Sequence, residues 1–267
     1  MIRYFLSVAV MAWAPLTYAE TMKIAVTTSF ENSGLADVLL PEIEADLGIE
    51  VHLLVVGTGQ ALRLGEAGDV DAILVHSRDA EEAFVLGGLG THRREIMYND
   101  FVLIGPESDE AGIANAANAS IAVQKIAQAK ATFVSRGDKS GTHKAELDIW
   151  RRANLDLETF GTWYRAVGAG MGGALNTASG MSAYILSDRA SWLNFKNKAS
   201  LVLLYSGDPA LFNQYAFLPV NPKKHAIIRY DLAMKVEGWL VSKKATDLIN
   251  GYTIDGEILF VFNAQDQ

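Results

Sequence analysis

The chain has 267 residues, no cysteine and a formal net charge of −8, and 50% of its residues are hydrophobic. This length suits one large domain or two smaller ones, and the composition is ordinary for a soluble globular protein. The negative charge excludes binding to nucleic acid or to an anionic membrane by charge alone. The lack of cysteine excludes disulfides, thiolate-bound zinc and iron–sulfur clusters.

The first 19 residues have the pattern of a secretory signal peptide. Arg3 supplies a positive charge, residues 4–14 form an apolar run, and residues 17–19 include small side chains of the kind a signal peptidase reads. We expect cleavage after Ala19 and export of the mature chain to the periplasm. The alternative is an N-terminal membrane anchor, for which the apolar run is short and is interrupted by Pro15.

The next part of the chain alternates strand-like and helical patterns. The expected strands span residues 22–28, 49–56 and 70–75, and a helix follows each of them. This β-α-β-α-β order is typical of a parallel sheet, in which ligands sit beyond the carboxyl ends of the strands. Thr28, Ser29 and Thr58 have that position.

A second α/β region follows a strand over 101–104 that we expect to cross between two lobes. The later expected strands span 131–134, 182–186, 201–204, 214–220 and 258–262, and the expected helices span 121–130, 188–195, 230–240 and 245–249. The segment 168–173 has Gly-x-Gly-x-x-Gly spacing, but no clear strand precedes it. We therefore interpret it as a helix N-terminus that faces a cleft rather than as a dinucleotide loop.

Residues 135–143 have the pattern of an anion-binding loop between a strand and an amphipathic helix. The backbone N–H groups of Ser140, Gly141 and Thr142 would open this helix without intrahelical partners, where the helix dipole adds partial positive charge. Arg136 adds a cation with a planar fork of donors. Together these groups favour a small tetrahedral anion.

Four stretches, in one order along nearly the whole mature chain, resemble the tungstate-binding proteins of ABC transporters. They are TTSFENSG (27–34), VGTGQAL (56–62), MYNDF (97–101) and SRGDKSGTH (135–143). The last of these also has the Arg-x-Asp-x-Ser-Gly-Thr spacing of periplasmic phosphate-binding proteins, and a more distant similarity extends to molybdate-binding proteins.

The resemblance implies a type II periplasmic-binding-protein fold. This is an α/β fold of two lobes, each a mostly parallel sheet flanked by helices, with the ligand cleft between them. The implied crossovers lie near Leu103 and Gln214. They divide the mature chain into a first lobe of residues 20–103 plus 214–267 and a second lobe of residues 104–213.

The resemblance also implies a set of oxyanion-binding residues, namely Thr28, Ser29, Thr58, Arg136, Ser140, Gly141 and Thr142. Each has a structural alternative, because the hydroxyl groups can cap helices and the guanidinium can pair with Asp138. The two roles of Arg136 are compatible if Asp138 orients one edge and the anion takes the other. Met171 and Gly172 are further candidates.

His76 follows the third strand, where phosphate-binding proteins place a carboxylate that accepts the proton of phosphate. No acid occurs here before Asp79, which argues against phosphate and for a fully deprotonated dianion. His76 can contact the ligand or can make one hydrogen bond at a helix entry. The histidines show no metal-ligand spacing, and no metal cation is expected.

The function implied by the resemblance is capture of tungstate, or of molybdate, and delivery to an ABC permease by a monomeric protein without a cofactor. Two alternatives remain. One is an oxyanion-binding sensor subunit with the same site. The other is a hydrolase or phosphatase-like enzyme with Ser29 or Ser140 as nucleophile and His76 or His143 as base, although the sequence has no Gly-x-Ser-x-Gly elbow.

Overall fold

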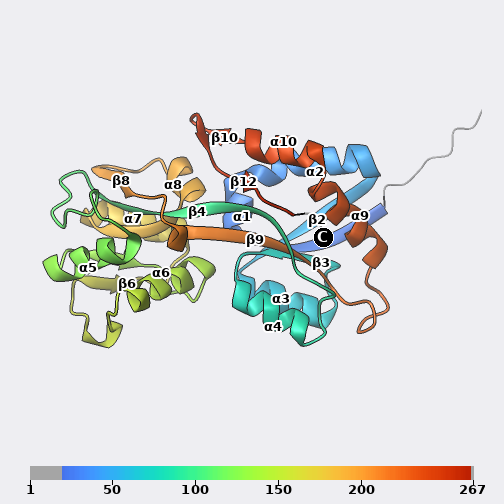
Figure 1. The fold of residues 1–267 in the computed structure, drawn as a ribbon, viewed down its shortest axis with the longest axis horizontal. Coiled ribbons are helices and arrows are strands. Elements are labelled where there is room, and N and C mark those ends of the chain that lie inside the picture. Colours follow the sequence, from blue (N-terminus) through green and yellow to red (C-terminus); the bar gives the residue numbers. More distant parts are fainter. Residues whose placement is uncertain (1–19, 266–267) are drawn as a thin grey trace, which may run out of the picture.

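The computed structural model describes residues 20–265, which form two lobes joined by two long strands, β4 (Arg94–Pro106) and β9 (Phe212–Pro219) (Figure 1). The expected signal peptide, residues 1–19, lies outside this described part of the chain. Between residues 20 and 265, none of the helices is both long and apolar enough to cross a lipid bilayer.

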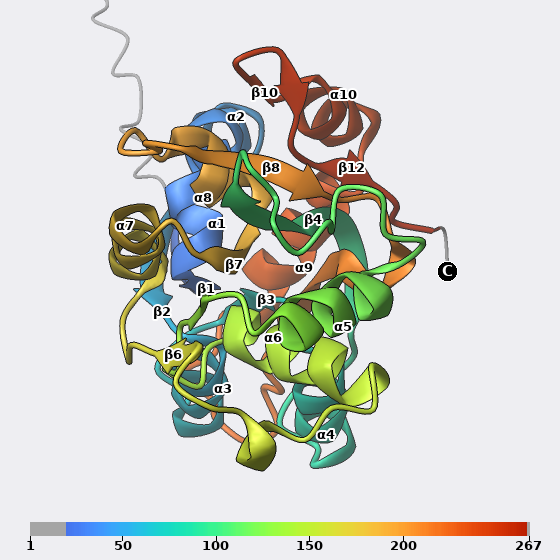
Figure 2. The ribbon, with the colours of Figure 1, turned by 90° about the vertical axis from the view of Figure 1, so that its left-hand side faces the viewer.

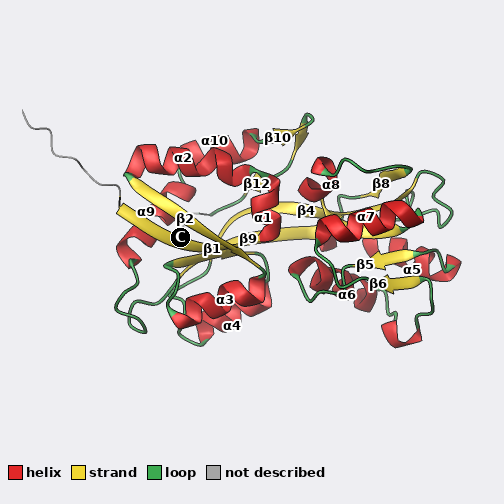
Figure 3. Ribbon diagram, turned by 180° about the vertical axis from the view of Figure 1, so that it is seen from behind, coloured by secondary structure: helices red, strands yellow, loops and turns green. Residues whose placement is uncertain are grey.

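The first lobe combines the two ends of the described chain. Its N-terminal part contains β1 (Glu20–Thr27), α1 (Thr28–Ser33), α2 (Leu35–Leu47), β2 (Ile49–Val56), α3 (Thr58–Ala67), β3 (Ala72–Val75) and α4 (Arg78–Leu86). Its C-terminal part contains α9 (Tyr230–Leu240), α10 (Lys243–Gly251), β10 (Thr253–Ile254), β11 (Glu257–Ile258) and β12 (Val261–Phe262). Helices α2, α9 and α10 cover one face of the sheet, and α3 and α4 cover the other (Figures 1 and 3).

The second lobe contains the middle of the chain. Its elements are α5 (Ala119–Ala129), β5 (Phe133–Ser135), α6 (Gly141–Arg152), β6 (Tyr164–Ala166), α7 (Met171–Met181), β7 (Tyr184–Asp188), α8 (Arg189–Asn194) and β8 (Leu201–Tyr205), with short 3-10 helices at Leu157–Thr159 and Pro209–Leu211. Figure 2 looks at this lobe from its outer end. Helices α5 and α6 pack on one side of the strands, and α7 and α8 pack on the other.

One continuous sheet runs through both lobes in the order β2-β1-β3-β9-β4-β7-β5-β6. In the first lobe β1 pairs in parallel with β2 and β3, and in the second β5 pairs in parallel with β6 and β7. The crossing strands β4 and β9 are antiparallel to their neighbours. The residues that follow β1 and β5, and the last residue of β7, line one cavity between the lobes.

The change of lobe along β4 lies between Asp100 and Phe101. Up to Asp100 the strand pairs with β9, and from Phe101 it pairs with β7. Phe101 and Leu103 both belong to the core of the second lobe. The second lobe therefore begins slightly before the boundary that was expected after Leu103. On the return, Leu211 packs in the second lobe and Tyr215 packs in the first.

One expected strand is wrong in detail, and one strand of the structure was not expected. The strand expected over 258–262 is split, because Asp255 and Gly256 have φ of 51° and 83° and turn β10 back onto β11, before β12 pairs with β4. A strand also precedes the glycine-rich segment, since β6 pairs in parallel with β5. Sequence reasoning missed β6 because it has only three residues, two of which are exposed.

Candidate functional site

A cavity of about 260 Å³ lies between the two lobes. The first lobe contributes Thr28, Ser29 and Asn32 from α1. The second lobe contributes Arg136, the start of α7, and the junction of β7 with α8; these lining residues are Arg136, Gly170, Met171, Gly172, Gly173, Asp188 and Ser191. Of the residues expected from sequence, this cavity therefore brings together Thr28, Ser29, Arg136, Met171 and Gly172.

Arg136 is held in a fixed orientation and is only 8% exposed. Its Nε and Nη2 donate to Asp138 Oδ2 at 3.1 and 2.5 Å, and its Nη1 donates to Thr142 Oγ1 at 3.3 Å. Partial burial alone would raise the pKa of Asp138, but hydrogen bonds from Ser140 and the charge of Arg136 hold that pKa below its ordinary value. Asp138 therefore remains ionised and fixes the cation at the cavity wall.

The N-terminus of α6 does not line the cavity. Ser140 caps the helix, because its Oγ accepts from the N–H of His143 at 3.3 Å. His76 packs against Gly141 so closely that a Cβ on the glycine would lie 2.6 Å from its Cε1. Ligand contact by Ser140, Gly141 and Thr142 stays a prediction that requires the imidazole to move.

At the start of α1, the side chain of Thr28 is exposed, whereas that of Ser29 is buried and hydrogen-bonded. Thr27 caps this helix, with its Oγ1 accepting from the N–H of Phe30 at 3.3 Å, so the capping role that the sequence offered to Thr28 and Ser29 belongs to their neighbour. Thr28 is exposed at the cavity. Ser29 Oγ lies 2.9 Å from Thr27 Oγ1 and 3.2 Å from the hydroxyl of Tyr215 on the crossing strand β9.

His76 closes this hydrogen-bond network with Nε2 at 3.1 Å from Ser29 Oγ. Its Nδ1 is buried and has no hydrogen-bond partner among the described residues. Burial, with a smaller contribution from the charge of Arg136, lowers the pKa of His76 to about 4. The imidazole is therefore neutral at physiological pH and adds no charge to the site.

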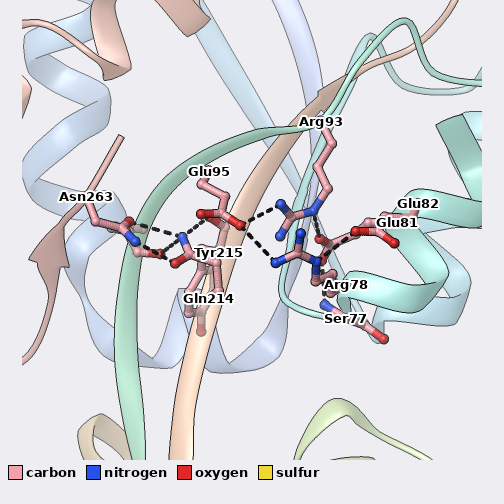
Figure 4. Close-up of polar contacts among 10 residues, drawn as sticks. Ser77, Arg78, Glu81, Glu82, Arg93, Glu95, Gln214, Tyr215 and Asn263 are labelled. Carbon is pink, nitrogen blue, oxygen red and sulfur yellow. Dashed lines mark hydrogen bonds and ion pairs between the residues drawn. The ribbon is translucent and has the colours of Figure 1, made fainter. Parts of the chain in front are cut away.

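An ion-pair network fixes the peptide that follows His76 (Figure 4). The N–H of Ser77 donates to Glu81 Oε1 at 2.5 Å, and Arg93 Nε donates to Glu81 Oε2 at 2.7 Å. Arg93 Nη1 also donates to Glu95 Oε1 at 2.7 Å, which ties the loop after β3 to the start of β4. Because Glu81 is fully buried, the network fixes the backbone that follows His76.

Asp188 is the titratable residue of the cavity that sequence reasoning missed, and Asn32, Gly170, Gly173 and Ser191 were not predicted either. Asp188 is 1% exposed, it lines the cavity, and its Oδ1 caps α8 by accepting from the N–H of Ser191 at 2.8 Å. Its Oδ2 is buried without a hydrogen-bond partner in the described chain. Burial raises the pKa of Asp188, against the opposing effects of Ser191 and Arg136. Asp188 is the last residue of β7, which is parallel to β5, and this position at the carboxyl end of a parallel strand could have indicated a ligand-binding residue.

Thr58 lies away from the cavity, although it is 4% exposed and its Oγ1 has no partner within residues 20–265. Its role in ligand binding stays a prediction. Nowhere in the same part of the chain do three or more His, Asp or Glu residues gather in a group that could hold a metal ion.

A family description matches this architecture: the PBP (periplasmic-binding-protein) superfamily domain aligns with residues 16–244. The chain belongs to this superfamily, and the two-lobed α/β fold predicted from the sequence is confirmed. Within it, the chain is 44% identical over 245 residues to the tungstate-binding protein TupA of Peptoclostridium acidaminophilum, covering 90% of this chain and 85% of that one.

Two solved structures agree with this relationship. The tungstate-binding protein TupA of Desulfovibrio alaskensis G20 superposes with a TM-score of 0.85 at 41% identity, covering 92% of this chain and all of that one. The tungstate ABC transporter protein of Geobacter sulfurreducens superposes with a TM-score of 0.80 at 47% identity, covering 87% of this chain and 99% of that one.

Proposed function

We propose that this protein is the solute-binding component of an ABC transporter, and that its solute is tungstate. The observation that carries the proposal is the cavity between the lobes, where a buried arginine held by Asp138 meets the open N-terminus of α7. The tungstate-binding names of relatives above 40% identity support the choice of solute.

The cavity suits an oxyanion for physical reasons. Gly170 caps α7 without a side-chain hydrogen bond, so the first N–H groups of this helix are available to a ligand. Arg136, held by Asp138, adds a charged donor, and the hydroxyl of Thr28 adds a donor from the opposite lobe. Because tungstate and molybdate have almost the same size and charge, molybdate is the second candidate solute.

The bound anion would bridge donors from both lobes and so would favour their closure. Strands β4 and β9 are the connections about which the lobes would move, as in other hinge-bending proteins. We propose that the protein works as a monomer in the periplasm, after removal of residues 1–19, and passes the anion to a membrane permease without any chemical step.

Calorimetric titration of the mature chain, from Glu20 onward, with tungstate, molybdate, sulfate and phosphate tests this function. We expect tight binding of tungstate and no heat with sulfate or phosphate. Arg136→Ala should weaken tungstate binding about 10- to 100-fold, because a charge-assisted hydrogen bond contributes about 1.5–3 kcal/mol.

The matched control is Arg151→Ala, which removes an arginine of the same lobe whose side chain is 77% exposed on α6. It should leave the affinity unchanged. Unchanged affinity in Arg136→Ala would place the binding site elsewhere, and silence with all four anions would reject the function.

An enzymatic function has one observation in its favour, the contact of Ser29 with His76 at 3.1 Å. The rest of the site opposes it. A nucleophile needs a base that titrates near neutral pH and a third group that orients the base. The pKa of His76 is lowered to about 4, and its Nδ1 has no partner in the described chain. Hydrolysis of a chromogenic phosphate or acyl ester that disappears in Ser29→Ala would restore this alternative.

A further inference from the structure

A buried carboxyl group stands in the wall of a cavity that is built to hold an anion. Asp188 is 1% exposed, and its two oxygens have different surroundings. Oδ1 accepts from the N–H of Ser191 at 2.8 Å, whereas Oδ2 is buried and unpartnered within residues 20–265. An ionised oxygen in this situation would have no donor to stabilise its charge, which is costly in a buried site.

The groups around Asp188 do not supply a compensating charge. Arg136 is a cation that lines the same cavity, and its guanidinium is already paired with Asp138. Arg189, the next residue, donates to both carboxylate oxygens of Asp100 at 2.7 and 2.6 Å. On the other elements around the cavity, His76 and the buried phenol of Tyr215 are neutral. Glu31 of α1 is exposed to solvent, and α7 carries no titratable side chain.

We propose that Asp188 is protonated in the liganded protein and donates a hydrogen bond from Oδ2 to an oxygen of the bound dianion, so that above the pKa of free Asp188 each anion is taken up together with one proton. The inference rests on the proposed function, and it adds a residue and a proton to the recognition of the same anion. The proton comes from solvent, stays on the carboxyl oxygen while the anion is bound, and returns to solvent on release.

The charge balance of the cavity argues for this state. If Asp188 were ionised, the bound dianion would lie beside a carboxylate. Arg136 would not offset the repulsion between them, because Asp138 already neutralises its charge. Protonation removes that repulsion and converts an acceptor into a donor, which an oxyanion without protons requires. The same carboxyl group would behave differently toward an anion that carries a proton, because ionised Asp188 could accept that proton.

Proton linkage is measurable by titration calorimetry with tungstate in two buffers of different ionisation enthalpy, at several pH values from 6 to 9. Wild-type protein should take up about one proton per anion at the upper end of this range. Its affinity should fall by up to about tenfold per pH unit once the pH exceeds the pKa of free Asp188.

Asp188→Asn is the decisive variant. Asparagine keeps an oxygen that can cap α8, and its amide can donate permanently to the anion, so the fold should be preserved and circular dichroism should confirm it. We expect binding without proton uptake, a flat pH profile, and affinity at pH 9 at least equal to that of wild type. Asp156→Asn is the matched control, because Asp156 caps the 3-10 helix at Leu157–Thr159 outside the cavity. It should leave the linkage intact.

Three other outcomes would overturn the inference. Wild-type binding with no proton uptake anywhere between pH 6 and 9 would show that Asp188 does not change its protonation state. Uptake that persists in Asp188→Asn would assign the proton to another group. In both cases tungstate still binds and the proposed function stands. Silence of wild-type protein with tungstate, molybdate, sulfate and phosphate would instead remove the function and the inference together.

Discussion

The loops that lead into α6 and α7 touch, yet the N-termini of the two helices present different surfaces. The contact between the loops is a hydrogen bond in which the N–H of Ala169 donates to the carbonyl of Arg136 at 3.2 Å. At α6 a serine caps the helix and an imidazole packs against its first residue. At α7 a glycine occupies the cap without a side-chain hydrogen bond, and the first turn lines the cavity.

The difference shows that a helix N-terminus is available to a ligand only when the protein does not satisfy it first. Ser140 and His76 occupy the α6 terminus, so its role there is structural in this conformation. Gly170 leaves the α7 donors free and has no atom within 4 Å of a Cβ built on it. The difference between the two helices can be tested by substitutions that alter one terminus at a time.

The largest effect is expected when α7 is given an acidic cap like those of other helices in the chain. Gly170 has φ of −62° and ψ of 167°, which any residue can adopt. Gly170→Asp should therefore fold, but it would place a carboxylate beside the bound dianion. We expect tungstate affinity to fall at least about 100-fold by calorimetry.

Gly170→Asn separates capping from charge, because its side chain competes for the same N–H groups without repelling the anion. It should weaken binding less than Gly170→Asp. If neither variant changes the affinity, α7 does not contact the ligand.

A second difference between the helices is that α6 carries a buried acid and α7 carries no titratable side chain. Glu146 Oε1 accepts from Trp150 Nε1 at 3.1 Å and from the hydroxyl of Tyr164 at 2.7 Å. Burial raises the pKa of Glu146 from 4.5 to about 7, against these hydrogen bonds. The unfolded chain releases this proton near pH 4.5, so stability should fall as pH rises from about 4.5 to 7.

Glu146→Gln keeps the oxygen that accepts both hydrogen bonds and removes the charge. In urea unfolding, we expect the stability advantage of the variant over wild type to be about 2 kcal/mol larger at pH 8 than at pH 5. The exposed Glu158→Gln should show no such difference. An equal effect of Glu146→Gln at both pH values would mean that Glu146 does not titrate in this range.

The fold was predictable where strands are buried on both faces and helices carry clear apolar faces. Helix α9 matches the prediction over 230–240, and the strands β1, β2, β3 and β9 lie within a few residues of theirs. The long strand β4 was predicted only over 101–104, because Arg94, Glu95 and Asp100 interrupt its apolar pattern. Glu95 pairs with Arg78 and Arg93, and Asp100 pairs with Arg189, and periodicity does not reveal these tertiary partners.

The candidate site was predictable as a region but not as a set of contacts. The motif around Arg136 identified a cavity residue and its partner Asp138, since both lie in one local loop. The packing of His76 on Gly141 joins residues from different lobes, and the unpartnered oxygen of Asp188 depends on burial. Neither arises from sequence spacing, so the sequence placed most of the site at α6, with Met171 and Gly172 of α7 as further candidates, whereas the structure opens α7 to the cavity.

The smallest effect on binding is expected at the α6 terminus. Ser140→Ala removes the acceptor for the N–H of His143 and should lower the free energy of unfolding by about 1 kcal/mol, as the loss of an N-cap usually does. Its tungstate affinity should change by less than about threefold if the ligand lies at α7. A loss of more than about tenfold, with the fold intact, would instead mean that His76 leaves Gly141 when the anion binds. The α6 terminus would then be a contact of the liganded state, and the two helix ends would share the anion between them.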